Sequence, residues 1–195
     1  MQAARGTSLN QSDSNTPKPS LRSRRRYLLL FAAIATAAYA ADVVTKVVAV
    51  EQLTDRPPVE LVGHYFSLYL ARNPGAAFST GTSYTVVLSC IAIAATVVVL
   101  WVARRLGSTG WAIALGFLLG GVAGNLTDRI FRSPGPLEGH VVDFFMFPNF
   151  PVFNMADNWI NLAAGTIILQ ALRGVRVDGR RDREEPEPTT GKSTP

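Results

Sequence analysis

The sequence predicts an all-α membrane protein with four transmembrane helices and a small β-structure outside the membrane. Of its 195 residues, 48% are hydrophobic and only 17% are charged. Formal charges are absent from residues 27–41 and 83–103, and runs of this kind suit the roughly 20 apolar residues needed to cross a bilayer. The runs are continuous rather than alternating, which favours helices over a membrane β-barrel.

Four spans can be placed along the chain. They cover about residues 27–50, 84–102, 111–126 and 156–172. All four are long enough to cross a bilayer, allowing for tilt. A cleavable signal peptide would also begin with a basic run and an apolar stretch. The first span is long for that role, however, and it ends in Asp42 and Lys46 rather than in a small-residue cleavage site.

The distribution of basic residues predicts the orientation. Fourteen of the 19 Lys and Arg residues lie in the two tails and in the loop between the second and third spans, and four lie in the other two loops. The positive-inside rule then places both termini in the cytoplasm. We expect residues 1–26 and 173–195 to be disordered cytoplasmic tails, since they are polar, charged and rich in Pro, and residues 27–172 to form the folded domain.

The two outer loops differ in pattern. Residues 61–70 (LVGHYFSLYL) are rich in β-branched and aromatic residues and predict one or two short strands, followed by a turn at residues 72–75. Residues 144–153 (FFMFPNFPVF) carry five Phe and two Pro, which suits either a segment at the membrane interface or a plug between helix ends. The sequence leaves these two alternatives open.

Several kinds of function are disfavoured by composition. Cys90 is the single cysteine, and His64 and His140 are far apart, so a disulfide framework or a metal site is not expected. The net charge of +5 is concentrated in the tails and one short loop, which is a topology signal rather than a nucleic-acid-binding stripe. The G-x-S-x-G, H-E-x-x-H and Walker-type motifs are absent from the sequence.

Two groups of polar residues stand where the membrane makes them costly. Asp42 and Lys46 are four residues apart in the first span, so they can pair on one helix face. That pair could brace the helix or help to shape a site. Asn125, Asp128 and Arg129 share a face at the outer end of the third span, after several glycines that permit close helix packing. They could wall a site or form a solvated helix end.

Two further carboxylates suggest a catalytic function. Asp143 is embedded in VVDFF, and Asp157 lies in the first turn of the fourth span, after Asn154. Both fall on the outer side of the predicted topology. Apolar surroundings raise a carboxyl pKa, and two close carboxyls can share one proton, as in aspartic proteases. The alternative for Asp157 is a simple favourable charge at a helix N-terminus.

Taken together, these motifs resemble lipoprotein signal peptidase, the signal peptidase II family. Five elements occur in the family order: Asp42-x-x-Thr45-Lys46, Asn73-x-Gly75-Ala76-Ala77-Phe78, Gly120-Gly121-x-x-Gly124-Asn125-Leu126-x-Asp128-Arg129, Val141-Val142-Asp143-Phe144 and Phe153-Asn154-x-Ala156-Asp157. The resemblance covers about residues 27–172 and neither tail.

The resemblance implies a four-helix aspartic endopeptidase of the bacterial inner membrane with a small extracytoplasmic β-cradle. Such an enzyme would cut before the diacylglyceryl-modified cysteine of a prolipoprotein, on the extracytoplasmic side, without metal or cofactor. Asp143 and Asp157 match the catalytic pair. The matches to substrate-binding residues are Asn73, Asn125, Arg129 and Asn154, and those to structural residues are Asp42, Lys46 and Asp128.

The expected partners are lipid-modified prolipoproteins and membrane lipid, with the protein acting as a monomer and without nucleic acid. The alternative function is that of a small multi-pass carrier or channel, in which Asp42, Lys46 and the carboxylates line a proton or ion path. The position of the carboxylates argues against a carrier or channel, because they lie at one surface instead of along a path through the membrane.

Overall fold

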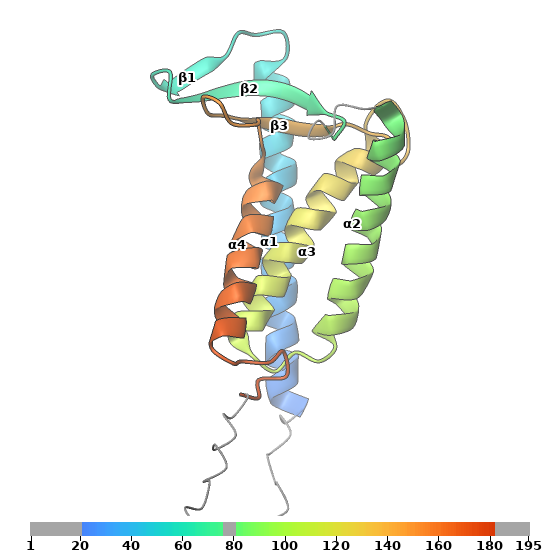
Figure 1. Cartoon of the computed structure of the whole chain (residues 1–195), viewed down its shortest axis with the longest axis vertical. Helices are drawn as coiled ribbons and strands as arrows, with labels where there is room; N and C mark the ends of the chain where they lie inside the picture. Colours follow the sequence, from blue (N-terminus) through green and yellow to red (C-terminus); the bar gives the residue numbers. More distant parts are fainter. Residues whose placement is uncertain (1–20, 76–80, 182–195) are drawn as a thin grey trace, which may run out of the picture.

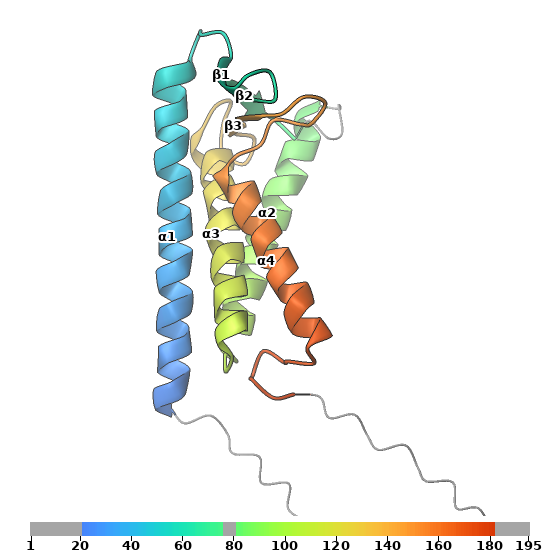
Figure 2. The same cartoon turned by 90° about the vertical axis from the view of Figure 1, so that its left-hand side faces the viewer.

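The fold is a bundle of four helices with a small sheet across one end (Figure 1). The computed structural model describes residues 21–75 and 81–181. The helices are α1 (Leu21–Leu53), α2 (Gly81–Ala103), α3 (Thr109–Phe131) and α4 (Met155–Leu172), and the strands are β1 (Val59–Val62), β2 (Phe66–Asn73) and β3 (Val141–Met146). The described chain begins and ends at the end of the bundle opposite the sheet (Figures 1 and 2).

Within residues 21–75 and 81–181, three helices are long and apolar enough to cross a membrane. They are α1, α2 and α3, and they include the first three predicted spans. The fourth predicted span is helical, but α4 is not among these three, because Asp157, Asn158 and Gln170 dilute its apolar residues. The mostly helical fold is therefore confirmed, whereas a fourth crossing of the membrane stays a prediction.

The sheet is antiparallel, in the order β1-β2-β3. The strands predicted within residues 61–70 are confirmed as β1 and β2. The predicted turn after them is also present, since Gly75 has a φ of 114° and its N–H donates to Oδ1 of Asn73 at 2.8 Å. Ala76, Ala77 and Phe78 of the predicted motif lie outside the described residues.

Strand β3 was not predicted. The composition of residues 144–153 favours an interfacial segment or a plug, but residues 141–146 pair with β2, and Phe153 bridges back to Phe145. The first four residues of β3 are buried, so the strand has no alternation of apolar and polar residues to identify it. Its pairing partner lies about 70 residues earlier in the chain, as in the register Ala71 with Asp143.

Helix boundaries also correct the predicted tails and loops. Helix α1 starts at Leu21, so residues 21–26 are helical rather than disordered; arginine and leucine are good helix formers. Helix α3 runs to Phe131, five residues beyond the predicted end of the third span. Residues 173–181 form a turn, in which Arg176 donates its N–H to the carbonyl of Arg180 at 2.8 Å. Residues 1–20 and 182–195, the remainder of the predicted disordered tails, lie outside the described residues.

Helix α3 lies at the centre and packs against the other three helices (Figure 2). Its glycines make this possible. A side chain at Gly120 would meet Ala38 of α1, and one at Gly121 would meet the backbone of Ala156 in α4. Close helix approach through small residues is the usual way in which membrane helices pack, as the sequence analysis expected.

Gly124 offers a test of this packing, because a β-carbon there would collide with the carboxylate of Asp42. We expect Gly124→Ala to lower the free energy of unfolding by about 1–3 kcal/mol through overpacking. Gly165→Ala in α4 is the matched control, since nothing lies within 4 Å of its added β-carbon. Thermal unfolding of both variants in detergent is the measurement, and equal midpoints would show that α1 and α3 do not need this close approach.

Candidate active site

Asp143 lies on β3, and its carboxylate receives hydrogen bonds from two asparagines. Asn73 Nδ2 donates to Oδ2 at 2.8 Å, and Asn154 Nδ2 donates to Oδ1 at 2.5 Å. The residue is only 2% exposed. Burial raises the pKa of Asp143 to about 6, the hydrogen bond from Asn73 opposes this rise and the charge of Asp157 adds to it. This carboxyl therefore holds its proton to a higher pH than an exposed aspartate does.

Asp157 lies in the first turn of α4, where it forms a capping box with Asn154. Its Oδ2 accepts the backbone N–H of Asn154, and its own N–H donates to the Asn154 side chain, both at 3.1 Å. The alternative considered from the sequence, a charge at a helix N-terminus, is thus part of the arrangement. The other oxygen, Oδ1, faces the site and accepts from Asn125 Nδ2 at 3.0 Å.

Two asparagines connect the two aspartates. Asn154 Nδ2, besides contacting Asp143, lies 3.1 Å from Oδ1 of Asn125. Asn125 in turn donates to Asp157. Three distant segments, β3, the end of α3 and the start of α4, therefore meet in one network of amides and carboxylates, and Asn73 joins it from β2.

Arg129 lies on α3 beside this network. Its charge is close enough to interact with those of Asp143, Asp157 and Asp128. Its Nη1 is buried and has no hydrogen-bond partner among residues 21–75 and 81–181. A buried donor without a partner costs about 1–3 kcal/mol, so Arg129 is prepared to bind a further acceptor.

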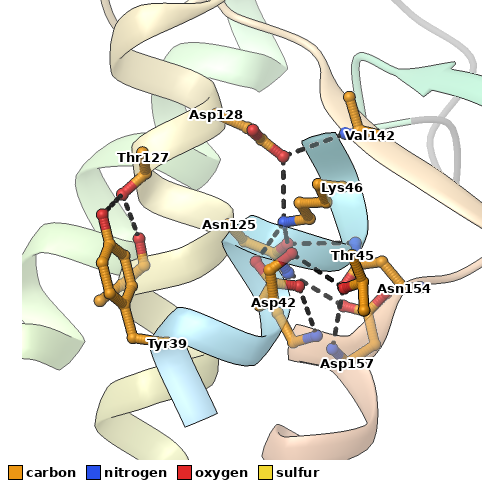
Figure 3. Close-up of polar contacts among 12 residues, drawn as sticks. Tyr39, Asp42, Thr45, Lys46, Asn125, Thr127, Asp128, Val142, Asn154 and Asp157 are labelled. Carbon is orange, nitrogen blue, oxygen red and sulfur yellow. Dashed lines mark hydrogen bonds and ion pairs between the residues drawn. The ribbon is translucent and has the colours of Figure 1, made fainter. Parts of the chain in front are cut away.

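Behind the site, Lys46 contacts two carboxylates and an amide (Figure 3). Its Nζ lies 2.7 Å from Asp42 Oδ2 and 3.0 Å from Asp128 Oδ2, and it donates to Asn125 Oδ1 at 2.8 Å. The predicted pairing of Asp42 with Lys46 is therefore confirmed. Lys46 is 1% exposed and Asp42 is fully buried, so each of these buried charges needs the other to offset the cost of its removal from water.

Each of these buried carboxylates also holds a backbone segment next to a candidate catalytic residue. Asp42 Oδ1 accepts the N–H of Ala156, the neighbour of Asp157, at 2.8 Å. Asp128 Oδ2 accepts the N–H of Val142, the neighbour of Asp143, at 3.1 Å (Figure 3). Lys46 bridges the two carboxylates, so one ion cluster fixes the positions of both aspartates from behind.

Three supporting residues are found only in the structure. Arg132 pairs with Asp128, and their i, i+4 spacing on one helix could have revealed it. Thr85 and Ser89 of α2 donate to the carbonyls of Pro74 at 2.5 Å and Leu137 at 2.6 Å. These two bonds anchor the turn after Asn73 and the loop before β3, contacts that spacing along the sequence could not predict.

Comparison with known proteins agrees with this arrangement. Residues 34–173 match the model of the family described as signal peptidase (SPase) II, which is well over half of the chain. The chain belongs to the signal peptidase II family. The lipoprotein signal peptidase of Mycolicibacterium smegmatis is 47% identical over 174 residues, covering 87% of this chain and 73% of that protein. That of Mycobacterium avium is 44% identical over 177 residues, covering 90% and 97%.

Solved structures support the same fold. One described as a bacterial membrane enzyme has a TM-score of 0.64 at 25% identity and covers 72% of this chain and 91% of that one. Another with the same description, 23% identical, has a TM-score of 0.62 and supports the fold alone. The signal peptidase II family and the three apolar helices make this a bacterial membrane peptidase, and the alternative of an ion carrier receives no support from these likenesses.

Proposed function

We propose that this signal peptidase II is an aspartic endopeptidase that removes the signal peptide from diacylglyceryl-modified prolipoproteins, cutting before the lipidated cysteine. The observation that carries the aspartic chemistry is the network that joins Asp143 and Asp157 through Asn154 and Asn125. The substrate follows from the likeness to proteins named lipoprotein signal peptidase. The active site then lies on the extracytoplasmic side, α4 is the fourth span, and both termini are cytoplasmic, as the basic residues predict.

In this mechanism one carboxyl acts as the general base and the other as the general acid. Asp157 acts as the base and accepts a proton from the water whose oxygen attacks the scissile carbonyl. Asp143 is the partner that we assign as the acid, because burial raises its pKa to about 6. When the C–N bond breaks, Asp143 gives its proton to the leaving nitrogen. Asp143 must hold this proton, so activity should decline as the pH rises through its pKa of about 6.

The surrounding residues have distinct proposed tasks. Asn73, Asn125 and Asn154 donate to the two carboxylates and hold them in orientation before substrate arrives. Arg129, whose Nη1 has no partner within the described residues, is placed to contact the substrate backbone. Asp42, Lys46 and Asp128 support this arrangement from behind. A monomer contains all of these residues, so we expect no second copy to be needed.

The decisive experiment is a cleavage assay with the purified full chain in detergent. A prolipoprotein carrying diacylglycerol on its cysteine should be cut before that cysteine, whereas the same polypeptide without the lipid should remain intact. Treatment with a chelator should leave the rate unchanged. Cleavage that disappears with chelator and returns with zinc would contradict an aspartic mechanism, and absence of cleavage of the lipidated substrate would contradict the proposed substrate.

A further inference from the structure

A second polar region lies at the end of the bundle opposite the sheet. Residues 173–181 fold back there against the loop between α2 and α3 (Figure 1). Trp111 Nε1 donates to the carbonyl of Val175 at 2.7 Å, and the N–H of Gly107 donates to the carbonyl of Val177 at 2.9 Å. These bonds hold the turn in a fixed position, so it forms a wall with the ends of two membrane-spanning helices.

This end of the protein is strongly basic. The exposed arginines in its described segments are Arg24, Arg25, Arg26, Arg104, Arg105, Arg173, Arg176, Arg180 and Arg181. Asp178 is the one acidic residue within residues 21–26, 103–110 and 173–181, and it pairs with Arg180 at 3.6 Å. The local field therefore attracts anions, and the ion pair already offsets the single negative charge.

A cavity of about 410 Å³ opens within this basic region. Two tryptophans, Trp101 and Trp111, form its aromatic wall, and three valines add further apolar surface. Two arginines line it from different segments, Arg105 from the loop after α2 and Arg176 from the C-terminal turn. Asp178 also lines the cavity, where its carboxylate pairs with Arg180. The central carbon of the Arg105 guanidinium lies 4.8 Å from the centroid of the Trp101 ring, a cation–π contact that places this charge at the aromatic wall.

We propose that this cavity binds the phosphate-bearing headgroup of an anionic phospholipid. Paired guanidinium groups match a phosphodiester in geometry and charge, and the aromatic and valine surface matches the glycerol and first acyl carbons beneath it. The cavity lies where α2 leaves the apolar part of the fold and α3 enters it, which is the level of lipid headgroups and of interfacial tryptophans. A soluble polyanion would need an exposed basic stripe instead of this half-apolar cavity.

Native mass spectrometry of the full chain with added phosphatidylglycerol or phosphatidylcholine tests the proposal. Phosphatidylglycerol should bind about tenfold more tightly than phosphatidylcholine, and the double variant Arg105→Gln/Arg176→Gln should lose that preference. The control Arg25→Gln/Arg173→Gln removes the same charge from two exposed arginines that do not line the cavity. This control variant should prefer phosphatidylglycerol over phosphatidylcholine to within about twofold of the wild-type preference.

Other outcomes would overturn the proposal. Equal losses in both double variants would show diffuse attraction to surface charge rather than a built site. Unchanged binding in Arg105→Gln/Arg176→Gln would place the lipid elsewhere. Displacement of the lipid by millimolar inorganic phosphate would identify a site for free phosphate instead. Thermal unfolding of Arg105→Gln/Arg176→Gln in detergent, compared with that of the control double variant, shows whether a loss of binding is a loss of fold.

Discussion

Asp143→Asn and Asp157→Asn are each expected to lower kcat/KM for the lipidated prolipoprotein at least about 10³-fold, since each removes one half of the acid–base pair. Asparagine has nearly the size of aspartate, but it can neither carry the proton to the leaving nitrogen nor accept one from water. The loss should appear in kcat rather than KM, because substrate contacts are retained. Cleavage rates measured at saturating and at limiting substrate concentrations separate the effect on kcat from the effect on KM.

The control for this pair is Asp178→Asn, which removes the same charge at the opposite end of the bundle. It should retain full activity. Thermal unfolding in detergent should show that Asp143→Asn and Asp157→Asn remain folded, because each keeps a side chain of the same shape in the asparagine network. If either variant cleaves at more than about a tenth of the wild-type rate, the proposed division of acid and base is wrong.

Lys46→Met should have the largest effect on stability. The change leaves the buried carboxylates of Asp42 and Asp128 without their shared cation, and breaking such a buried pair costs about 3–5 kcal/mol. The free energy of unfolding, measured by denaturant in detergent, should fall by that amount. Arg56→Met removes an exposed cation after α1 and is the matched control, expected to change stability by less than about 0.5 kcal/mol.

Lys46→Met also has a readout that a purely structural role would not produce. The charge of Lys46 lowers the pKa of Asp143, so removing it should raise that pKa further above its present value of about 6. Asp143 would then keep its proton to a higher pH, and the alkaline decline of kcat/KM should move to higher pH. Asp42→Asn/Lys46→Met should recover part of the lost stability, because one uncompensated carboxylate is gone. If the pH profile of kcat/KM does not move, the charge of Lys46 does not act on the catalytic carboxyl of Asp143.

The sequence predicted the helices well because a membrane span is recognisable from one continuous apolar run. It also placed the candidate site residues in the correct local settings: Asn125 and Arg129 on one helix, and Asp157 in the first turn of α4. Pairs at i, i+4 spacing, such as Asp42 with Lys46, needed only the geometry of a single helix. Their catalytic and binding roles remain predictions.

Longer-range relationships could not be predicted in this way. Strand β3 has no pattern of its own, and it exists because β2 offers it a hydrogen-bonding edge. The backbone contacts from Asp42 to Ala156 and from Asp128 to Val142 join segments that are 114 and 14 residues apart. Such contacts depend on which helices pack together, and glycines that look similar in the sequence support packing against different partners.

By itself, the sequence determined that the chain enters a membrane, which polar residues stand at costly positions and which family motifs they form. Those properties follow from hydrophobicity and from spacing within single elements. Only the tertiary structure decided that Lys46 bridges Asp42 and Asp128, the two carboxylates that hold the backbone beside Asp157 and Asp143. It also decided that the C-terminal turn completes a basic cavity. Side chains far apart in the chain meet only when packing fixes the distance between their elements.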